Sequence, residues 1–285
     1  MLNLEKFDAD HAQHVPKESK GVTEREVVDI EERAQPSTPV IYEVVRRLGE
    51  EEMARPAVSL WWSGVAAGLS ISFSLLAQAV LYVHLPDAIW RPLVTGFGYS
   101  VGFLMVVLSR QQLFTENTIT VVLPVMKQFS LANLGRLGRL WSIVFAANMT
   151  GTLFAALFCT FTPVLTPELR HGMLEISRHM MENDWSEMFF KGISAGFLIA
   201  AMVWLVPSAD TAKFHAVTLM TYLIAIGGFT HVVAGSMEAF LLVANGQLGI
   251  GMMIADFVIP VLMGNIVGGT ALFALISHAQ VMKEM

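Results

Sequence analysis

Apolar residues gather into six regions after residue 55, with short polar connections between them. Each region is long enough, or nearly so, to supply the roughly 20 helical residues that are needed to cross the hydrocarbon core of a bilayer. The six regions span residues 58–83, 93–126, 139–162, 188–206, 216–244 and 252–278. The pattern predicts an all-α membrane protein with six transmembrane helices within residues 56–285.

The chain before these regions is polar and strongly charged. Residues 1–37 are acidic and poor in aromatic residues, which predicts a disordered cytoplasmic tail. Residues 38–55 carry apolar positions at helical spacing with charges opposite, so we expect an amphipathic helix. Such a helix could lie on the membrane surface or beneath the bundle. A solvated tail helix is the alternative.

Two of the six regions are long and contain a polar or glycine-rich patch. The patches are SRQQLFTENT at 109–118 and GGFTHVVAGS at 227–236. Non-helical backbone at membrane depth is tolerated only where protein buries it or where it lines a cavity. We therefore predict that the second and fifth helices are broken near a central site. Two continuous helices that pack through small residues are the alternative.

Short segments repeat between the two halves of the chain. GVAAG at 64–68 matches GISAG at 192–196. Phe-Thr occurs at 114–115 before Asn148, and again at 229–230 before Asn265. The matches predict two three-helix repeats, about 58–160 and 188–278. An odd number of crossings per repeat inverts the second, and an inverted 3+3 repeat is typical of membrane transport proteins.

Composition and charge agree with a membrane protein. Apolar residues make up 54% of the chain and charged residues 15%, against about a quarter in soluble domains. The first 55 residues hold 8 of the 18 Lys and Arg and 13 of the 24 Asp and Glu, so charge is depleted elsewhere. A net charge of −6 gives no basic footprint for nucleic acid. Basic residues beside the apolar regions place both termini in the cytoplasm, as expected of an inner (plasma) membrane protein.

The sequence carries no recognisable enzyme motif, and we predict no cofactor. The single cysteine, Cys159, cannot form an intrachain disulfide. His171, Glu175 and His179 are spaced four residues apart and could bind a metal on a helix. A solvated amphipathic helix is the preferred interpretation, so no metal site is predicted.

Polar residues at the patches are the candidate site. His231 can change charge near neutral pH, so it could donate a hydrogen bond or a proton to a small anion. A neutral histidine that bonds backbone is the alternative. Thr115 offers a hydroxyl from the other half, either as a pore group or as a helix cap. Four more polar residues are interpreted as structural. Asn148 and Asn265 could satisfy backbone groups in the adjacent patches. Arg110 and Glu116 flank the first break and could form an ion pair, since buried charges are normally paired.

The motifs LFTENT, FTHVVAGS and IPVLMGNIVGGTALF resemble the formate/nitrite transporter family, in order and with similar spacing. The segment STPVIYEVVRRLGEEEMARPAVSLWWSG resembles the YfdC-type branch of that family. The resemblance implies an aquaporin-like fold and a homopentamer in the lipid bilayer. Each protomer would have its own pore for a small monovalent anion or its weak acid.

The resemblance also implies roles for individual residues. His231 would be the central pore histidine and Thr115 the hydroxyl that faces it. Phe103 and Ile224 match one apolar constriction of the pore, and Phe114 matches the other. A narrow apolar constriction penalises a bare charge, so protonation of the cargo near the histidine would ease its passage.

The chain departs from the family pattern around the histidine. Thr230 replaces a glutamate, and Gly196 and Gly235 replace two asparagines. Arg110 stands where the family has a small residue. The two glycines predict a wider and less polar pocket. Three functions remain open: a channel or proton-coupled carrier, a facilitator of a small neutral solute, and a non-conducting sensor or scaffold that acts through its acidic tail.

Overall fold

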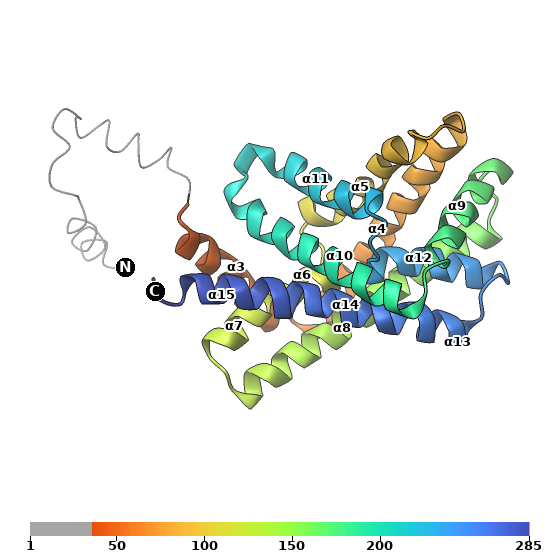
Figure 1. Cartoon of the computed structure of the whole chain (residues 1–285). Helices are drawn as coiled ribbons and strands as arrows, with labels where there is room; N and C mark the ends of the chain where they lie inside the picture. The colour runs from red at the N-terminus through yellow and green to blue at the C-terminus, as the bar shows by residue number, and fades with distance from the viewer. Residues whose placement is uncertain (1–35, 285) are drawn as a thin grey trace, which may run out of the picture. The chain divides into compact units, whose positions relative to one another are not determined.

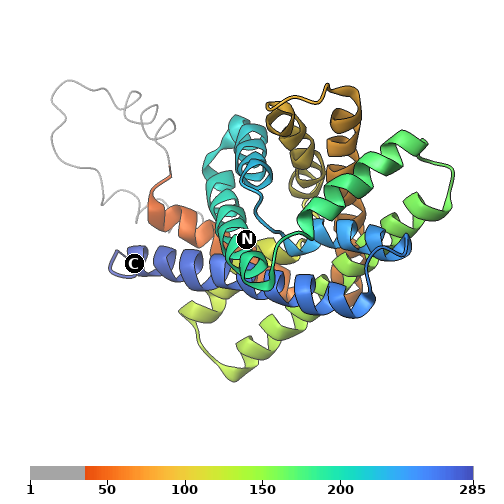
Figure 2. The ribbon, with the colours of Figure 1, turned by 45° about the vertical axis from the view of Figure 1, so that its right-hand side comes forward.

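The structure, a computed structural model, describes residues 36–284, which form a bundle of helices (Figures 1 and 2). Almost all of the predicted tail, residues 1–35, lies outside the described residues. The first half contains α3 (Thr38–Ala54), α4 (Ala57–His84), α5 (Arg91–Leu108), α6 (Phe114–Thr120), α7 (Val122–Lys127) and α8 (Leu131–Phe161). The second half begins with α9 (Pro167–Met180), α10 (Trp185–Leu205), η1 (Val206–Ser208), η2 (Asp210–Ala212), α11 (Lys213–Ile226) and α12 (Val232–Ala244).

One long helix closes the chain. It runs without interruption through α13 (Ile250–Met252), η3 (Met253–Val258), α14 (Ile259–Ile266), η4 (Val267–Ala274) and α15 (Leu275–Val281). Its η3 and η4 segments are π-helical, with a wider turn than an α-helix. In the views of Figures 1 and 2 this helix lies along one side of the bundle next to α10, which packs against it.

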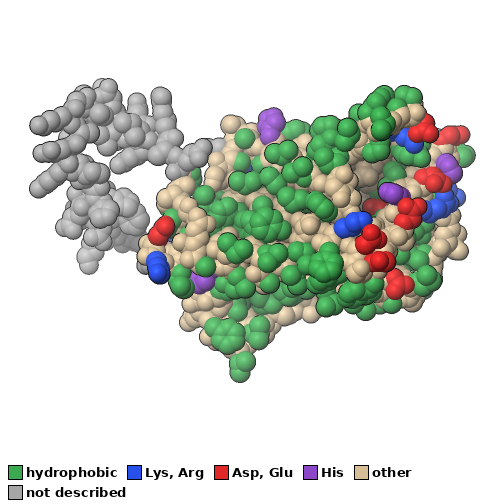
Figure 3. All heavy atoms as spheres, in the orientation of Figure 1, with side chains coloured by type: hydrophobic (Ala, Val, Ile, Leu, Met, Phe, Trp, Pro, Cys, Tyr) green, Lys and Arg blue, Asp and Glu red, His purple; other side chains and the backbone are tan. Residues whose placement is uncertain are grey.

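Five described helices are long and apolar enough to cross a membrane. They are α4, α5, α8, the helix at Trp185–Ser208 and the helix at Ile250–Val281. The helices α11 and α12 are apolar but shorter. Figure 3 shows apolar side chains across the middle of one face, while the charged side chains gather toward its two ends. A bilayer matches this distribution, since charge at its centre is costly.

Local sequence explains where several helices begin. The Ser130 side chain accepts a hydrogen bond from the backbone N–H of Asn133 at 3.1 Å and so caps α8. At the start of α10, Asp184 and Glu187 form a reciprocal capping box. These caps satisfy backbone donors that the first turn of a helix leaves free.

Two helices stop at the polar patches, and they stop in the same way. After α5 the N–H of Gln111 donates to the carbonyl of Val106 at 3.0 Å, and after α11 the N–H of Phe229 donates to Ile224 at 3.0 Å. Each ending contains one residue with positive φ, Arg110 at 54° and Gly228 at 61°. This is the Schellman ending, in which glycine is favoured because it lacks a Cβ. Arg110 adopts the same backbone with a side chain.

A buried asparagine holds the chain beyond the first ending. The Oδ1 of Asn148, on α8, accepts the N–H of Phe114 at 2.9 Å. Its Nδ2 donates to the carbonyls of Gly64 at 2.8 Å and Gln112 at 2.9 Å. The side chain therefore satisfies backbone groups that the helices leave free, as expected of buried polar groups.

Asn265, on α14, repeats this arrangement at the second ending. Its Oδ1 accepts the N–H of Val232 at 2.8 Å. Its Nδ2 donates to the carbonyls of Gly192 at 2.9 Å and Thr230 at 3.0 Å. The prediction that both asparagines satisfy backbone at the patches therefore agrees with the contacts.

These contacts fix which residues of the two halves correspond. Gly64 matches Gly192, as GVAAG and GISAG predict. Phe114, the first residue of α6, matches Val232, the first residue of α12. The predicted match between Phe114 and Phe229 is therefore wrong by three residues, because Phe229 lies three residues before α12 begins. The Phe-Thr identity is a coincidence of sequence.

Candidate functional site

His231 lies at the start of α12, in the interior of the bundle, and is 2% exposed. Its Nδ1 accepts a hydrogen bond from the backbone N–H of Ala234 at 3.1 Å. A ring nitrogen that accepts carries no hydrogen, so the neutral ring has its hydrogen on Nε2. The imidazole therefore caps α12 with one nitrogen and presents a donor with the other.

The second nitrogen faces the other half of the chain. The distance from Nε2 of His231 to Oγ1 of Thr115 is 2.7 Å. Thr115 lies in the first turn of α6 and is fully buried. The structure thus brings together His231 and Thr115, as the sequence predicts, where α6 and α12 begin.

The three residues predicted to form constrictions are buried around this contact. The ring of Phe103 meets the imidazole edge-on, with 5.1 Å between ring centroids. Ile224 is fully buried two residues before the end of α11. Phe114 is 3% exposed, and its ring packs against Phe145 of α8. Of the three, Phe103 contacts the imidazole directly, and Ile224 lines a cavity together with His231.

A cavity of about 400 Å³ reaches His231 from the end of the bundle that carries α9. We call it the α9 cavity. Its walls come from α9, α10, α11, the second patch and α12, with Gln78 of α4 and Tyr99 of α5. The lining residues from α11, the second patch and α12 include Ile224, Gly228, Phe229, Thr230, His231, Gly235 and Glu238.

A second cavity, of about 340 Å³, lies beside the first patch, and we call it the α3 cavity. His231 lines only the α9 cavity, and Thr115 lines neither of the two cavities. Residues of the patch and α6 form one wall, and α3 covers the opening. The main lining residues are Arg110, Gln111, Gln112, Glu116 and Thr120, with Glu51 and Glu52 from α3.

Glu52 is a site residue that the sequence analysis missed. Its carboxylate accepts hydrogen bonds from Thr120 Oγ1 at 2.6 Å, Asn117 Nδ2 at 3.1 Å and Gln112 Nε2 at 3.2 Å. Burial raises the pKa of Glu52, and these hydrogen bonds oppose that shift. A signal was present, because Glu52 continues the helical spacing of the buried Tyr42, Val45 and Gly49.

The predicted ion pair between Arg110 and Glu116 does not form. Arg110 is exposed, whereas Oε1 of Glu116 is buried and has no hydrogen-bond partner among residues 36–284. The left-handed backbone at Arg110 belongs to the helix ending, where the main chain has already turned away from α5. The two side chains share the α3 cavity without touching.

The Thr230 hydroxyl and Gly196 both face neighbouring helices instead of the imidazole of His231. The Thr230 hydroxyl donates to the carbonyl of Met188 at 2.8 Å, so it is directed toward α10. At Gly196 a Cβ would overlap the backbone of Asn265. Gly196 lines neither the α9 cavity nor the α3 cavity, and its missing side chain lets α10 and α14 approach closely.

Gly235 does line the α9 cavity, but the predicted extra space is filled. A Cβ there would lie 2.7 Å from Cζ of Phe257 and 2.9 Å from the sulfur of Met180. Phe257 is fully buried and comes from the π-helical segment η3. A bulky ring from another helix therefore takes the place of the missing side chain.

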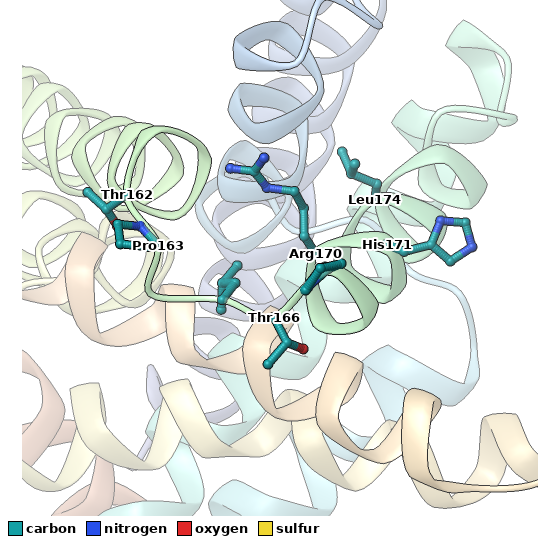
Figure 4. A pocket seen from close by; sticks show the side chains of 8 residues that line it. Thr162, Pro163, Thr166, Arg170, His171 and Leu174 are labelled. Atoms are coloured by element: carbon teal, nitrogen blue, oxygen red, sulfur yellow. The ribbon is translucent and has the colours of Figure 1, made fainter.

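A third cavity lies apart from the histidine, at the corner between α8 and α9 (Figure 4). It measures about 350 Å³, and Arg170 extends from α9 on one side of it. The guanidinium donates to the carbonyl of Cys159 at 3.1 Å and to that of Thr160. A cation at the last carbonyls of a helix stabilises that end, so this corner is structural.

The histidines of α9 contact separate carboxylates. Nε2 of His171 lies 3.8 Å from Glu175, and Nδ1 of His179 lies 2.7 Å from Glu182. In the part of the chain that the structure describes, no three His, Cys, Asp or Glu residues are grouped so that they could hold a metal.

Comparisons with known proteins place the chain in one family. The family model described as formate/nitrite transporter matches residues 39–279. The inner membrane protein YfdC of Escherichia coli K12 is 43% identical over 285 residues, which cover 100% of this chain and 92% of that protein. The formate channel FocA of Haemophilus influenzae is 27% identical, over 75% of this chain and 84% of its own length.

Solved structures share the fold. A pentameric formate channel with formate bound aligns with a TM-score of 0.68 at 21% identity, covering 80% of this chain and 98% of its own. An FNT family ion channel aligns with a TM-score of 0.71 at 20% identity, covering 85% and 98%. The apolar helices and these matches identify a multi-pass membrane protein. The resemblance seen in its motifs is thereby confirmed, and the chain belongs to the formate/nitrite transporter family.

Proposed function

We propose that the protein is an inner-membrane channel or proton-coupled transporter for a small monovalent anion or its weak acid, such as formate or nitrite. One observation carries the proposal. His231 lines the α9 cavity, and its donor Nε2 lies 2.7 Å from the buried hydroxyl of Thr115, which comes from the other half of the chain. Ionisable residues inside membrane proteins commonly mark transport pathways.

The proposed architecture is aquaporin-like, with six crossings in an inverted 3+3 repeat. The α5–α6 and α11–α12 pairs would each form one broken crossing, with the breaks at mid-membrane. The matched Schellman endings and the matched Asn148 and Asn265 contacts support two equivalent halves. Broken helices in corresponding places of two repeats are typical of sites for transported solutes.

The geometry suggests how a solute would pass. An oxygen of the solute would take the hydrogen bond that Nε2 of His231 gives to Thr115. The N-terminal end of α12 adds a partial positive charge beside it. The buried ring of Phe103 disfavours a bare charge, so a solute that carries a proton crosses this point more easily than its anion.

We further propose a homopentamer with both termini in the cytoplasm. The pentamer is supported by the likeness to the pentameric formate channel. The orientation is supported by the basic residues beside the apolar regions, such as Arg55 and Lys127. In this orientation the α3 cavity opens to the cytoplasm and the α9 cavity opens to the opposite side.

Flux through purified protein in liposomes tests the proposal. With a pH-sensitive dye inside, addition of formate or nitrite should give an internal pH change that is fast with wild-type protein and lost with His231→Ala. His215→Ala is the matched control, because His215 is exposed on α11. Equal flux in the wild type and His231→Ala would contradict the assigned pathway.

The same assay separates the other candidate functions. Flux of uncharged solutes alone would indicate a neutral-solute facilitator. No flux of any solute, together with capture of a cytoplasmic protein that depends on residues 1–37, would indicate a non-conducting scaffold.

A further inference from the structure

We propose that the carboxyl group of Glu238 is the acid that gives a proton to an anion inside the α9 cavity and so converts it to the uncharged weak acid. This inference rests on the proposed transport function and names the proton donor, which that function leaves unassigned. It follows from where Glu238 lies and from the partners that it lacks.

Glu238 shares a cavity and a helix face with His231. It lies on α12, seven residues after His231, which is about two helical turns or roughly 10 Å along the helix axis. Both side chains line the α9 cavity of about 400 Å³, which has room for water and for a small solute. A solute in this cavity can therefore reach the carboxyl group as well as the imidazole.

Burial holds Glu238 in its uncharged form. The residue is 8% exposed, and among residues 36–284 no group donates a hydrogen bond to its carboxyl oxygens and no cation pairs with it. A bare carboxylate in such a setting is costly, so the carboxyl group keeps its proton near neutral pH. It is then a carboxylic acid whose O–H group can donate to a solute in the cavity.

The other titratable groups of the cavity do not neutralise Glu238. They are Tyr99, His179, Glu182, Glu187, Lys191 and His231. His179 contacts Glu182 at 2.7 Å, and Lys191 contacts the side-chain oxygen of Asn183. Glu187 belongs to the capping box of α10. The cavity therefore leaves the carboxyl group without a counter-ion.

The elements that pack against α12 outside the cavity add no counter-ion either. In α9, Arg178 pairs with Glu175, and in η3 Asp256 is exposed. Glu116 of α6 lines the α3 cavity. The helices α4 and α8 place no charged side chain in the described lining of the α9 cavity.

Tyr99 supplies a second O–H group to the same cavity. It lies on α5, is 7% exposed, and its hydroxyl has no hydrogen-bond partner within residues 36–284. A phenol with an ordinary pKa of about 10 donates a hydrogen bond but keeps its proton near neutral pH. Tyr99 is therefore a positioning residue for the anion, and Glu238 is the group that can give it a proton.

His231 is poorly suited to give the proton itself. Only the charged ring is an acid near neutral pH, and that form carries hydrogen on both nitrogens. Nδ1 accepts the N–H of Ala234 at 3.1 Å, which favours the neutral ring. The imidazole therefore binds the solute through Nε2, while the proton comes from Glu238.

The transfer conserves atoms and charge. The O–H bond of the Glu238 carboxyl group breaks, its electron pair stays on the carboxylate, and a new O–H bond forms on the anion, so that formate becomes formic acid. A hydronium ion from the water on the same side then returns a proton to Glu238. One anion and one proton leave this side together, and no net charge crosses.

The first half of the chain has no acid at the equivalent position. Phe114 matches Val232, so six residues further along Thr120 matches Glu238. A threonine hydroxyl donates hydrogen bonds but does not give up its proton near neutral pH. Loss of Glu238 should therefore affect entry through the α9 cavity only.

The experiment measures uptake of labelled formate into right-side-out membrane vesicles, which in the proposed orientation expose the α9 cavity to the added formate. Uptake is compared at about pH 6 and about pH 7, where formate is almost entirely the anion. Wild-type uptake should change by less than about twofold, because Glu238 stays protonated over this range. In Glu238→Gln it should fall about tenfold, because the uncharged fraction of a weak acid in water falls about tenfold for each pH unit above its pKa.

Three variants and a second vesicle type provide the controls. Glu238→Asp keeps an acid and should retain the weak pH dependence. Glu182→Gln removes an exposed carboxyl group from the lining of the same cavity and should behave as the wild type. Tyr99→Phe should slow uptake by about twofold to fivefold at both pH values without a steeper pH dependence. In inside-out vesicles Glu238→Gln should match the wild type.

A measurement on the wild-type protein decides if Glu238→Gln does not assemble. A hydrophobic carbodiimide attacks protonated carboxyl groups, so it should modify Glu238 near neutral pH, as located by peptide mass spectrometry. An unmodified Glu238 would overturn the proposal.

The outcomes of the uptake experiment are distinct. Wild-type uptake that falls about tenfold between the two pH values, or Glu238→Gln uptake that stays level, overturns the proton donor and leaves the transport function standing. A steeper pH dependence of Glu238→Gln in both vesicle types also overturns it, since a general disturbance of packing acts from both sides. If wild-type vesicles take up no more formate than vesicles without the protein, the proposed function itself fails.

Discussion

Several buried side chains make hydrogen bonds through two of their polar atoms and so connect the helices at the centre of the bundle. His231 accepts from Ala234 with one ring nitrogen and faces Thr115 with the other. Asn148 and Asn265 each join one helix start to two carbonyls of other segments. Unpaired polar groups in a buried setting cost roughly 1–3 kcal/mol each, so these side chains stabilise the buried backbone where α6 and α12 begin.

Gly196 and Gly235 should respond differently to a Cβ. Gly196→Ala pushes a methyl group against the backbone of Asn265, which cannot move without displacing α14. Gly235→Ala meets only the side chains of Phe257 and Met180, which can adjust. We expect Gly196→Ala to destabilise the protein by about 2–3 kcal/mol and Gly235→Ala to destabilise it less. The thermal unfolding midpoint in detergent should therefore fall further for Gly196→Ala than for Gly235→Ala.

A second substitution checks the reason for the difference. Phe257→Leu should rescue Gly235→Ala, because the smaller side chain frees the space that the new methyl group needs. It should not rescue Gly196→Ala. Equal destabilisation by the two alanines would refute this account of how the glycines pack.

The contact between His231 and Thr115 could be predicted from the sequence, but its surroundings could not. An isolated ionisable residue in an apolar region is visible as a pattern. Phe257 fills the space beside Gly235 from another helix, and no local pattern near Gly235 records this. Glu52 was overlooked because a charged residue on an amphipathic helix is normally placed on its solvated face.

At the scale of helices, α3 is the element that ties separate parts of the chain together. Tyr42 bonds Nδ1 of His278 on α15 at 2.7 Å. Glu52 contacts the first patch and α6, and Glu43 reaches Lys127 on α7 at 3.4 Å. The helix that covers the α3 cavity is therefore held by polar contacts to three neighbours.

The ion pairs of Glu43 make the docking of α3 sensitive to acid. Hydrogen bonds from Arg46, and also from Arg47 and Lys127, hold the pKa of Glu43 well below its ordinary range. A carboxylate with a lowered pKa stabilises the folded state above its unfolded pKa, near ~4.3, and this contribution is lost as the pH falls further. Glu43→Gln should therefore speed hydrogen exchange in α3 at neutral pH by roughly twofold to fivefold, the effect of a partly exposed ion pair.

The sign of the pH effect provides the check. The difference between the wild type and Glu43→Gln should shrink when exchange is compared at about pH 3, because Glu43 loses its charge most readily in the undocked helix. Glu51→Gln is the control, since Glu51 is exposed on the same helix. A difference that grows on acidification would contradict the ion-pair explanation.

Element type was easier to predict than the details of helix geometry. The six apolar regions are all largely helical, and two helices end immediately before the predicted patches, at Leu108 and Ile226. The π-helical segments η3 and η4 were not foreseen, since a wider turn leaves no clear mark on apolar spacing. The Phe-Thr match misaligns the two halves because identity at two positions in the sequence does not report the backbone contacts that define equivalent residues.

For the whole molecule, the surface separates what lipid covers from what water covers. Large apolar side chains such as Phe73, Phe97 and Phe154 are exposed on different helices. Charged side chains gather toward the ends of the face seen in Figure 3. Apolar surface of this extent requires lipid or neighbouring protomers around the bundle.

The proposed orientation can be tested with single cysteines. In a Cys159→Ser background, which removes the only native thiol, Glu182→Cys should react with a membrane-impermeant maleimide added outside intact cells or spheroplasts. Lys283→Cys should react only after the membrane is permeabilised, because the proposed orientation places the C-terminus in the cytoplasm. The background protein without an added cysteine should stay unlabelled, and the reverse pattern would place the termini outside.

The nitrogen of His231 that caps α12 links acid–base chemistry to helix winding. If Nδ1 took up a proton, it could no longer accept the hydrogen bond from the N–H of Ala234, and the first turn of α12 would lose its cap. Charging the ring is thus a mechanical event as well as an electrical one. A neutral ring keeps the hydrogen bond to Ala234 and still has Nε2 available as a donor. The ring could therefore bind a solute without unwinding the first turn of α12.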